Sequence, residues 1–212
     1  MNAPQSRQPS RKLIFLIGAS AGLAGFLIAK VMVPVTVYSF QEHDLFLARN
    51  IGFVFPALIG LAAGCVEGSL SRMLQGMTVG SLVGFLYASL CGNKFDVGMA
   101  ILGLPCFCGG LMAVLIGSSQ SPRITGAPAR LGKGMVAGLA CGAVYLLSVN
   151  LIVAFVLKPV YVSDVSAYRA IVWKTGLPSM IIAGGIFQCL FCWAIGLRSG
   201  SKPSAQAASP EK

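Results

Sequence analysis

Charged residues are scarce in this chain. Only 10% of its 212 residues are Asp, Glu, Lys or Arg, while 56% are apolar, and its mean hydropathy is +0.80. Because soluble domains carry about 25% charged residues, a water-soluble fold would need an implausibly large core. The composition excludes that class and indicates an all-α integral membrane protein.

Histidine and acidic residues are also few. His43 is the one histidine among 212 residues, which excludes a two-histidine metal site. The apolar stretches contain no pair of aspartates, and the chain has no phosphate-binding glycine loop. We therefore expect no enzymatic activity, no catalytic residue and no cofactor. The basic residues are scattered without an aromatic stacking platform, so nucleic acid is not an expected partner.

Cysteine is the exception, with 7 residues. Cys106, Cys108, Cys189 and Cys192 lie in two apolar stretches that we expect to be equivalent, and four thiolates could hold zinc or an iron–sulfur cluster. Residues two apart point to different sides of a helix, however, and thiolates are costly in an apolar environment. We interpret the cysteines as small apolar side chains packed between helices and expect no metal site. Their odd number and apolar surroundings argue against a disulfide framework.

Six apolar stretches are present, and a bilayer is spanned by about 20 helical residues. They predict a transmembrane domain over residues 13–197, between a basic segment at 1–12 and a disordered tail at 198–212 that is rich in Ser, Ala and Pro. The third stretch is short, so the second and third could instead form a broken or re-entrant pair. The six stretches are Leu13 to Val33, Ile51 to Leu70, Met77 to Cys91, Val97 to Gly117, Leu131 to Leu157 and Leu177 to Leu197.

Glycine recurs at every fourth residue inside these stretches. Because small residues let membrane helices approach closely, the rows predict glycine-zipper contacts, within the chain or with other subunits in a homo-oligomer or complex. The rows are Gly60-Gly64-Gly68, Gly76-Gly80-Gly84 and Gly134-Gly138-Gly142.

An internal repeat is indicated by these rows. The pattern from Gly76 to Tyr87 recurs from Gly134 to Tyr145, and Gly-Leu-Pro followed by Gly-Gly occurs twice. We therefore predict three tandem helical hairpins at 13–72, 76–117 and 131–197, each pairing a glycine-row helix with a proline-bearing one. Resemblance among glycine-rich membrane helices by composition alone is the alternative.

Lys and Arg concentrate in the terminal segments and in the second and fourth connections. Since basic residues accumulate on the cytoplasmic side, we expect both termini in the cytoplasm and place the chain in a bacterial inner membrane. The first apolar stretch continues to Val33, so we expect an uncleaved anchor rather than a signal peptide.

Polar residues within the spans are the candidates for a cavity or ion site. We select Glu67, Gln188 and Asn150, although Glu67 could simply pair with Arg72 and the two amides could bond between helices. Lys30 is expected to extend toward the outer surface.

Charged residues in the first and fifth connections form a second candidate group. Asp44, Arg49, Asp164 and Arg169 occur as two Asp-to-Arg pairs with the same five-residue interval. They are expected to belong to short interfacial helices that the aspartates cap, or to an outward-facing charged mouth.

Two function classes follow. The first is a permease for a small solute or lipid, or its membrane subunit. The second is a non-catalytic structural or assembly subunit that binds other membrane proteins through its glycine faces. Few buried charges favour the second class, and the repeat favours the first; a hydrophobic substrate would need little buried charge.

Overall fold

The computed structural model describes residues 9–34, 36, 39–91, 99–120, 126–157 and 165–197. Every element in these ranges is helical, as the sequence predicts. The elements are α1 (Arg11–Val31), α2 (Phe40–Glu67), α3 (Leu70–Cys91), the π-helix η2 (Met99–Gly103), α4 (Leu104–Gln120), α5 (Ala127–Ile152), the π-helix η3 (Val153–Leu157) and α6 (Val165–Ala194).

Local sequence signals explain several helix ends. The side chains of Ser10 and Ser39 accept hydrogen bonds from the amides of Leu13 and Glu42, so both serines are N-caps. Gly68 ends α2 in the left-handed conformation, with φ +69°, which glycine adopts at little cost. The turn at Gly68 and Ser69 therefore connects two full helices.

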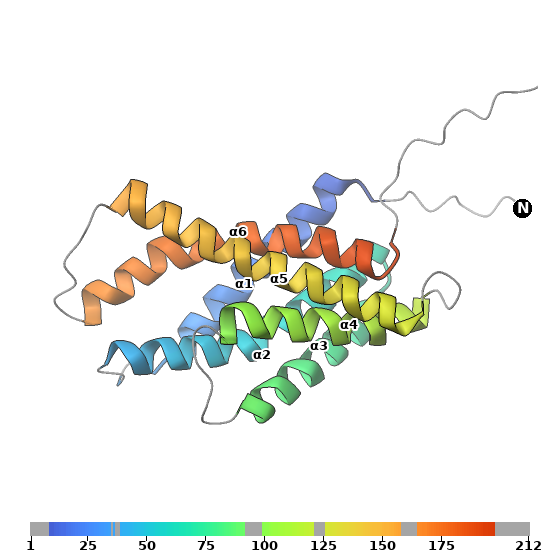
Figure 1. The fold of residues 1–212 in the computed structure, drawn as a ribbon, viewed down its shortest axis with the longest axis horizontal. Coiled ribbons are helices and arrows are strands. Elements are labelled where there is room, and N and C mark those ends of the chain that lie inside the picture. The colour runs from blue at the N-terminus through green and yellow to red at the C-terminus, as the bar shows by residue number, and fades with distance from the viewer. Residues whose placement is uncertain are drawn as a thin grey trace, which may run out of the picture.

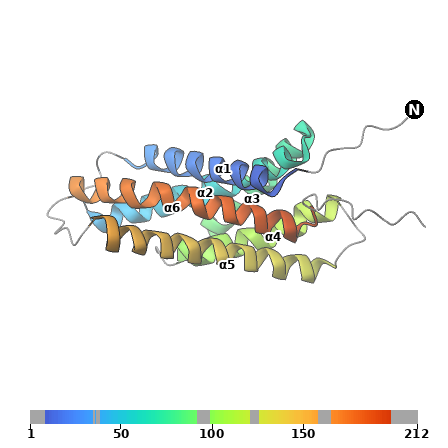
Figure 2. The ribbon, with the colours of Figure 1, turned by 90° about the horizontal axis from the view of Figure 1, so that it is seen from above.

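The helices run along the long axis of an elongated bundle, and successive helices run in opposite directions (Figures 1 and 2). The end at which α1 begins and α6 ends is here named the terminal end; Gly68 and Gly126 also lie there. The opposite end, where α1 ends and α2 and α6 begin, is named the distal end. Both described chain ends thus lie at one end of the bundle (Figure 1).

Five helices are long and apolar enough to cross a membrane, and the segment Ile101–Gly117 is a shorter apolar helix. The prediction of an all-α multi-pass membrane protein is confirmed. The re-entrant alternative is not what the structure has, because α2 contains 28 residues and α3 contains 22. The short member of the set is α4 rather than α3.

The second and sixth helices begin earlier in the chain than the predicted starts at Ile51 and Leu177. In the structure α2 begins at Phe40 and α6 at Val165. Asp44 therefore does not cap a short interfacial helix: Ser39 is the cap, and Asp44 lies in the early turns of a continuous helix. Polar residues at these helix ends resemble loop composition, but tertiary contacts keep them helical.

Three helix pairs meet with their backbones in contact. A Cβ added to Gly60 would overlap the backbone of Gly76, one added to Gly80 would overlap Pro56, and one added to Gly138 would overlap Pro105. Gly18 and Gly22 of α1 approach α6 in the same way. Glycine is required at these positions because any side chain would force the helices apart.

These close contacts join α2 to α3, α4 to α5 and α1 to α6. The predicted hairpins instead pair the first helix with the second, the third with the fourth and the fifth with the sixth. Each of these backbone contacts therefore joins helices of two different predicted hairpins. The glycines face a helix that lies outside their own predicted hairpin. The threefold repeat itself stays a prediction.

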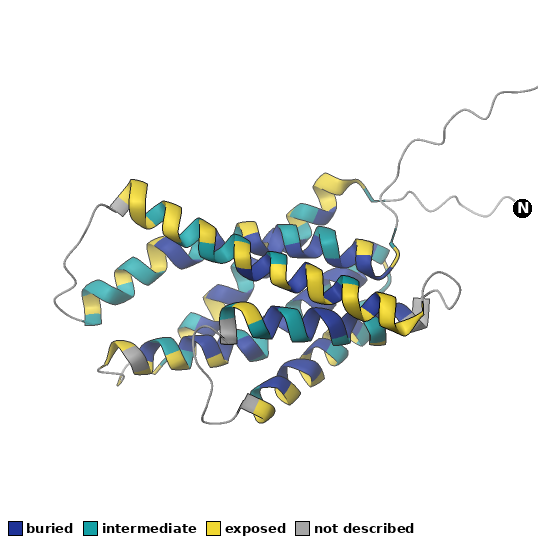
Figure 3. Cartoon of the chain, viewed as in Figure 1, coloured by how far each residue is buried: buried dark blue, intermediate teal, exposed yellow. Residues whose placement is uncertain are grey.

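Burial differs strongly among the helices. In the most apolar window of each span, 56% of α6 and 50% of α2 are buried, against 11% of α5. Figure 3 shows exposed residues along much of α5 and mostly buried or intermediate ones along α6. The two central helices therefore carry most of the side chains that could form an interior site.

Candidate functional site: an apolar cavity with a polar mouth

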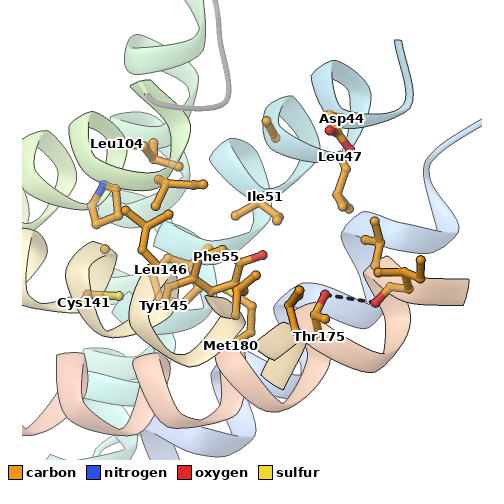
Figure 4. A pocket seen from close by; sticks show the side chains of 18 of the residues that line it. Asp44, Leu47, Ile51, Phe55, Leu104, Cys141, Tyr145, Leu146, Thr175 and Met180 are labelled. Carbon is orange, nitrogen blue, oxygen red and sulfur yellow. Dashed lines mark hydrogen bonds between the residues drawn. The ribbon is translucent and has the colours of Figure 1, made fainter. Parts of the chain in front are cut away.

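A cavity of about 340 Å³ lies between α2, α5, α6 and the junction of η2 with α4. This volume is at the lower end of small-molecule pockets. Apolar side chains form most of its wall, and Figure 4 shows Asp44 at one end and Cys141 and Leu104 at the other. The polar side chains that line it are Asp44, Tyr145, Tyr168 and Thr175.

Asp44 belongs to a hydrogen-bonded network at the distal end. The Tyr168 hydroxyl donates to Asp44 Oδ2 at 2.5 Å, and His43 Nδ1 lies 3.3 Å from Asp44 Oδ1. The Lys30 ammonium contacts His43 Nε2 at 2.5 Å. These four residues, named here the mouth network, join α1, α2 and α6.

Aromatic packing supports this network. The ring of Tyr168 meets Phe40 edge-on at 5.0 Å and His43 at 5.8 Å between centroids. His43 is completely buried, and Arg169 is close enough for its charge to act on both His43 and Lys30. The network is thus a packed unit in which Asp44 carries the negative charge and Lys30 and Arg169 carry positive charge.

The structure brings together part of the predicted charged mouth. Asp44 and Arg169 lie in the same neighbourhood at the distal end. Arg49 is exposed and is absent from the cavity wall, because it lies on another side of α2. Asp164 lies outside the described residues.

The predicted cavity residues Glu67, Gln188 and Asn150 are dispersed. Glu67 Oε2 lies 3.6 Å from Arg72 Nε at the terminal end. Asn150 is exposed, and its amide donates to Leu146 O in its own helix at 2.8 Å. None of the three is among the residues that line the cavity, because each faces a different contact.

Gln188 is completely buried where α6 meets α1. Its amide nitrogen lies 3.5 Å from Cys192 Sγ, and its Oε1 has no hydrogen-bond partner among the described residues. The side chain is therefore a poorly satisfied polar group within a tight helix contact.

The cysteines are dispersed as well. Within the described ranges, no group of three or more His, Cys, Asp or Glu side chains is placed to hold a metal ion. Cys108 and Cys192 are buried, while Cys106 and Cys189 are half-buried.

A serine motif that the sequence reasoning overlooked is also present. Gly18-Ala19-Ser20-Ala21-Gly22 matches Gly-x-Ser-x-Gly, but it lies in the middle of α1 rather than on the strand-to-helix turn that exposes a nucleophile. Ser20 is exposed on the bundle surface, while both glycines pack on α6. The motif here serves helix packing.

Sequence reasoning also missed the mouth network. The sequence pattern predicts only that Lys30 extends toward the outer surface, and it gives no reason to join Lys30 to His43 and Tyr168. One available signal was the Ser39-x-x-Glu42 spacing, which is typical of a helix start. That start would have placed His43 and Asp44 on a helix next to the end of α1.

Comparison with known proteins adds no relationship: no protein-family model, no curated protein sequence and no solved structure matches this chain. The site must therefore be interpreted from its own geometry.

Proposed function

We propose that this protein is a permease, or the membrane subunit of one, for a hydrophobic small solute or a lipid. The observation that supports this proposal is the apolar cavity of about 340 Å³ between α2, α5, α6 and the start of α4. Pockets that bind small molecules are mostly apolar with a few polar groups that orient the ligand. Asp44, Tyr168 and Thr175 would be those groups here.

The sparse charge in the spans favours an apolar substrate over an ion. Coupled ion transport usually needs titratable side chains that converge within the membrane. In the described residues Glu67 is paired with Arg72 at the terminal end. The titratable side chains that do converge, Lys30, His43 and Asp44, lie at the distal ends of their helices rather than in the middle of the spans. A hydrophobic ligand needs no such converging charges.

The alternative of an assembly subunit relied on glycine faces that are free to bind other proteins. Apart from Gly68, the glycine rows on α2, α3 and α5 are instead occupied by this chain's own backbones. Of the described glycines, those with open space around them are Gly68, Gly132 and Gly196 near helix ends. This occupancy weakens the case for glycine-mediated partners and supports the permease proposal.

We further propose that the terminal end faces the cytoplasm of a bacterial inner membrane. Basic side chains at this end include Arg11, Lys12, Arg72, Arg130 and Lys133, and Glu67 is the acidic residue described there. Such a bias agrees with the positive-inside tendency. The cavity mouth at the distal end would then face the opposite leaflet.

Native mass spectrometry of the protein purified in mild detergent tests the proposal. Leu146 lines the cavity, while its neighbour Leu147 is 60% exposed. We expect a bound small molecule in the wild type that is lost in Leu146→Trp, because indole fills the cavity, and that is kept in the matched variant Leu147→Trp. Reconstituted vesicles should lose transport of that molecule in the same variant.

An empty bundle that retains a stoichiometric protein partner would overturn the proposal in favour of the assembly subunit. Equal ligand loss in both tryptophan variants would also count against the cavity, because it would show that the molecule sits on the lipid-facing surface.

A further inference from the structure

We propose that the cavity selects a neutral single-chain amphiphile with a hydroxyl head group, and that this hydroxyl donates a hydrogen bond to Asp44. This inference rests on the proposed function and specifies its ligand. It follows from the position, hydrogen-bonding capacity and charge of the mouth network, and from the size of the cavity.

Polarity is confined to one end of the cavity, as Figure 4 shows for Asp44 against Leu104 and Cys141. Asp44 lies in the early turns of α2 at the distal end, the level at which a helix leaves the hydrocarbon and meets the head-group region. An amphiphile with its head at Asp44 would extend its tail toward the middle of the bundle. This orientation matches that of a lipid in the surrounding leaflet.

Asp44 retains the capacity to accept further hydrogen bonds. A carboxylate offers about four acceptor positions, and the contacts with Tyr168 and His43 occupy one position on each oxygen. The Asp44 side chain is 28% exposed and lines the cavity. An acceptor is therefore available at the mouth.

The hydroxyl protons of Tyr168 and Thr175 are already committed. Tyr168 donates to Asp44, and Thr175 donates to the carbonyl of Ile171 at 2.9 Å. A ligand that is itself a donor complements Asp44, because a ligand with acceptors alone would leave the free acceptor positions of this carboxylate without a partner.

The charge balance favours a neutral donor. Lys30 and Arg169 are both close to the Asp44 region, so the carboxylate is already compensated, and a cationic head would add excess positive charge. An anionic head would face Asp44, which is the charged residue on the described cavity wall, and like charges repel. A hydroxyl avoids both penalties.

The volume limits the apolar part. A cavity of about 340 Å³ is at the lower end of small-molecule pockets. It therefore suits a ligand with one alkyl chain better than one with two. A 12-carbon alcohol is a suitable probe.

The test uses the full chain in phosphatidylcholine nanodiscs with a photoreactive dodecanol that carries a diazirine in its chain. We expect crosslinks to cavity residues such as Leu146 and Val149. Unlabelled 1-dodecanol should compete at a mole fraction about tenfold lower than dodecylamine at pH 7, dodecanoate or dodecane, as expected for one hydrogen bond to a charged acceptor.

Variants at Asp44 test the acceptor role. Asp44→Leu should reduce cavity labelling about tenfold or more, whereas Asp44→Asn should keep most of it because the amide oxygen still accepts. Arg49→Gln, a change on the same helix outside the cavity wall, should label like the wild type. Thermal unfolding of each variant shows whether it is folded.

Two failures are distinguishable. Cavity labelling that dodecylamine, dodecanoate or dodecane displaces as well as dodecanol, or that persists in a folded Asp44→Leu variant, would overturn the hydroxyl assignment and leave the permease proposal standing. Absence of any cavity labelling in the wild type, with the same pattern in Leu146→Trp, would overturn the proposed function as well.

Discussion

The glycine contacts and the cavity show two ways in which the same helices meet. Along α2·α3, α4·α5 and α1·α6, glycines bring backbones together without space for a methyl group. Between α2, α5 and α6, larger side chains meet and leave about 340 Å³ open. Small residues thus build tightly packed pairs, and the space for a ligand remains where those pairs face one another.

The largest loss of stability is expected where a new side chain would push apart two helices whose backbones are in contact. Gly138→Ala would place a Cβ against the carbonyl of Pro105, whereas Gly132→Ala on the same helix would meet nothing within 4 Å. Because backbone atoms cannot move aside without separating α4 and α5, we expect Gly138→Ala to destabilise the protein by about 3 kcal/mol or more. Gly132→Ala should be neutral or slightly stabilising.

Thermal unfolding of both variants in the same detergent provides the measurement. Equal midpoints for Gly138→Ala and Gly132→Ala would mean that α4 and α5 are not in backbone contact at this position.

A gain in stability of intermediate size is expected from a substitution at Gln188, inside the contact between α1 and α6. Gln188 is buried, and its Oε1 has no hydrogen-bond partner among the described residues. Gln188→Met keeps the length of the side chain and removes the unsatisfied oxygen, so we expect a stabilisation of about 1–2 kcal/mol. Binding of the cavity ligand should be unchanged.

The matched variant is Gln75→Met, which removes an amide that accepts from Arg72 at 2.9 Å and should give no gain in stability. A loss of ligand with Gln188→Met in the native mass spectra would instead return Gln188 to the list of binding residues.

The smallest change in stability is expected from the loss of a single hydrogen bond between two helices. Asn50 is buried and donates to Ala29 O of α1 at 3.1 Å, while Asn150 bonds within its own exposed helix surface. Interhelical hydrogen bonds in membranes contribute about 0.6 kcal/mol on average. Asn50→Leu should therefore cost roughly 0.5–1 kcal/mol in a chemical unfolding titration, and Asn150→Leu should lie within error of the wild type.

The reverse ranking of the two leucine variants would indicate that Asn150, and not Asn50, makes the contact that holds helices together. It would also revive the sequence prediction that Asn150 faces a functional interior.

The functional residues were harder to predict than the spans. Glu67, Gln188 and Asn150 were selected because each is polar within an apolar stretch, yet the structure separates them into an ion pair, a helix contact and an exposed surface. Polarity at a given depth does not specify which side of a helix a residue occupies relative to its neighbours. Asp44 was selected as part of a charged mouth, and among the candidates that the structure describes it is the one that lines the cavity.

The amino-acid sequence by itself determined that this is an all-α multi-pass membrane protein, since long apolar stretches must satisfy their backbone hydrogen bonds as helices in lipid. It also determined where close packing was possible, because glycine spacing is a local property. Only the tertiary structure decided which helices meet at those glycines and that Lys30, His43, Asp44 and Tyr168 converge. These outcomes depend on contacts between residues far apart in the chain, which no local pattern encodes.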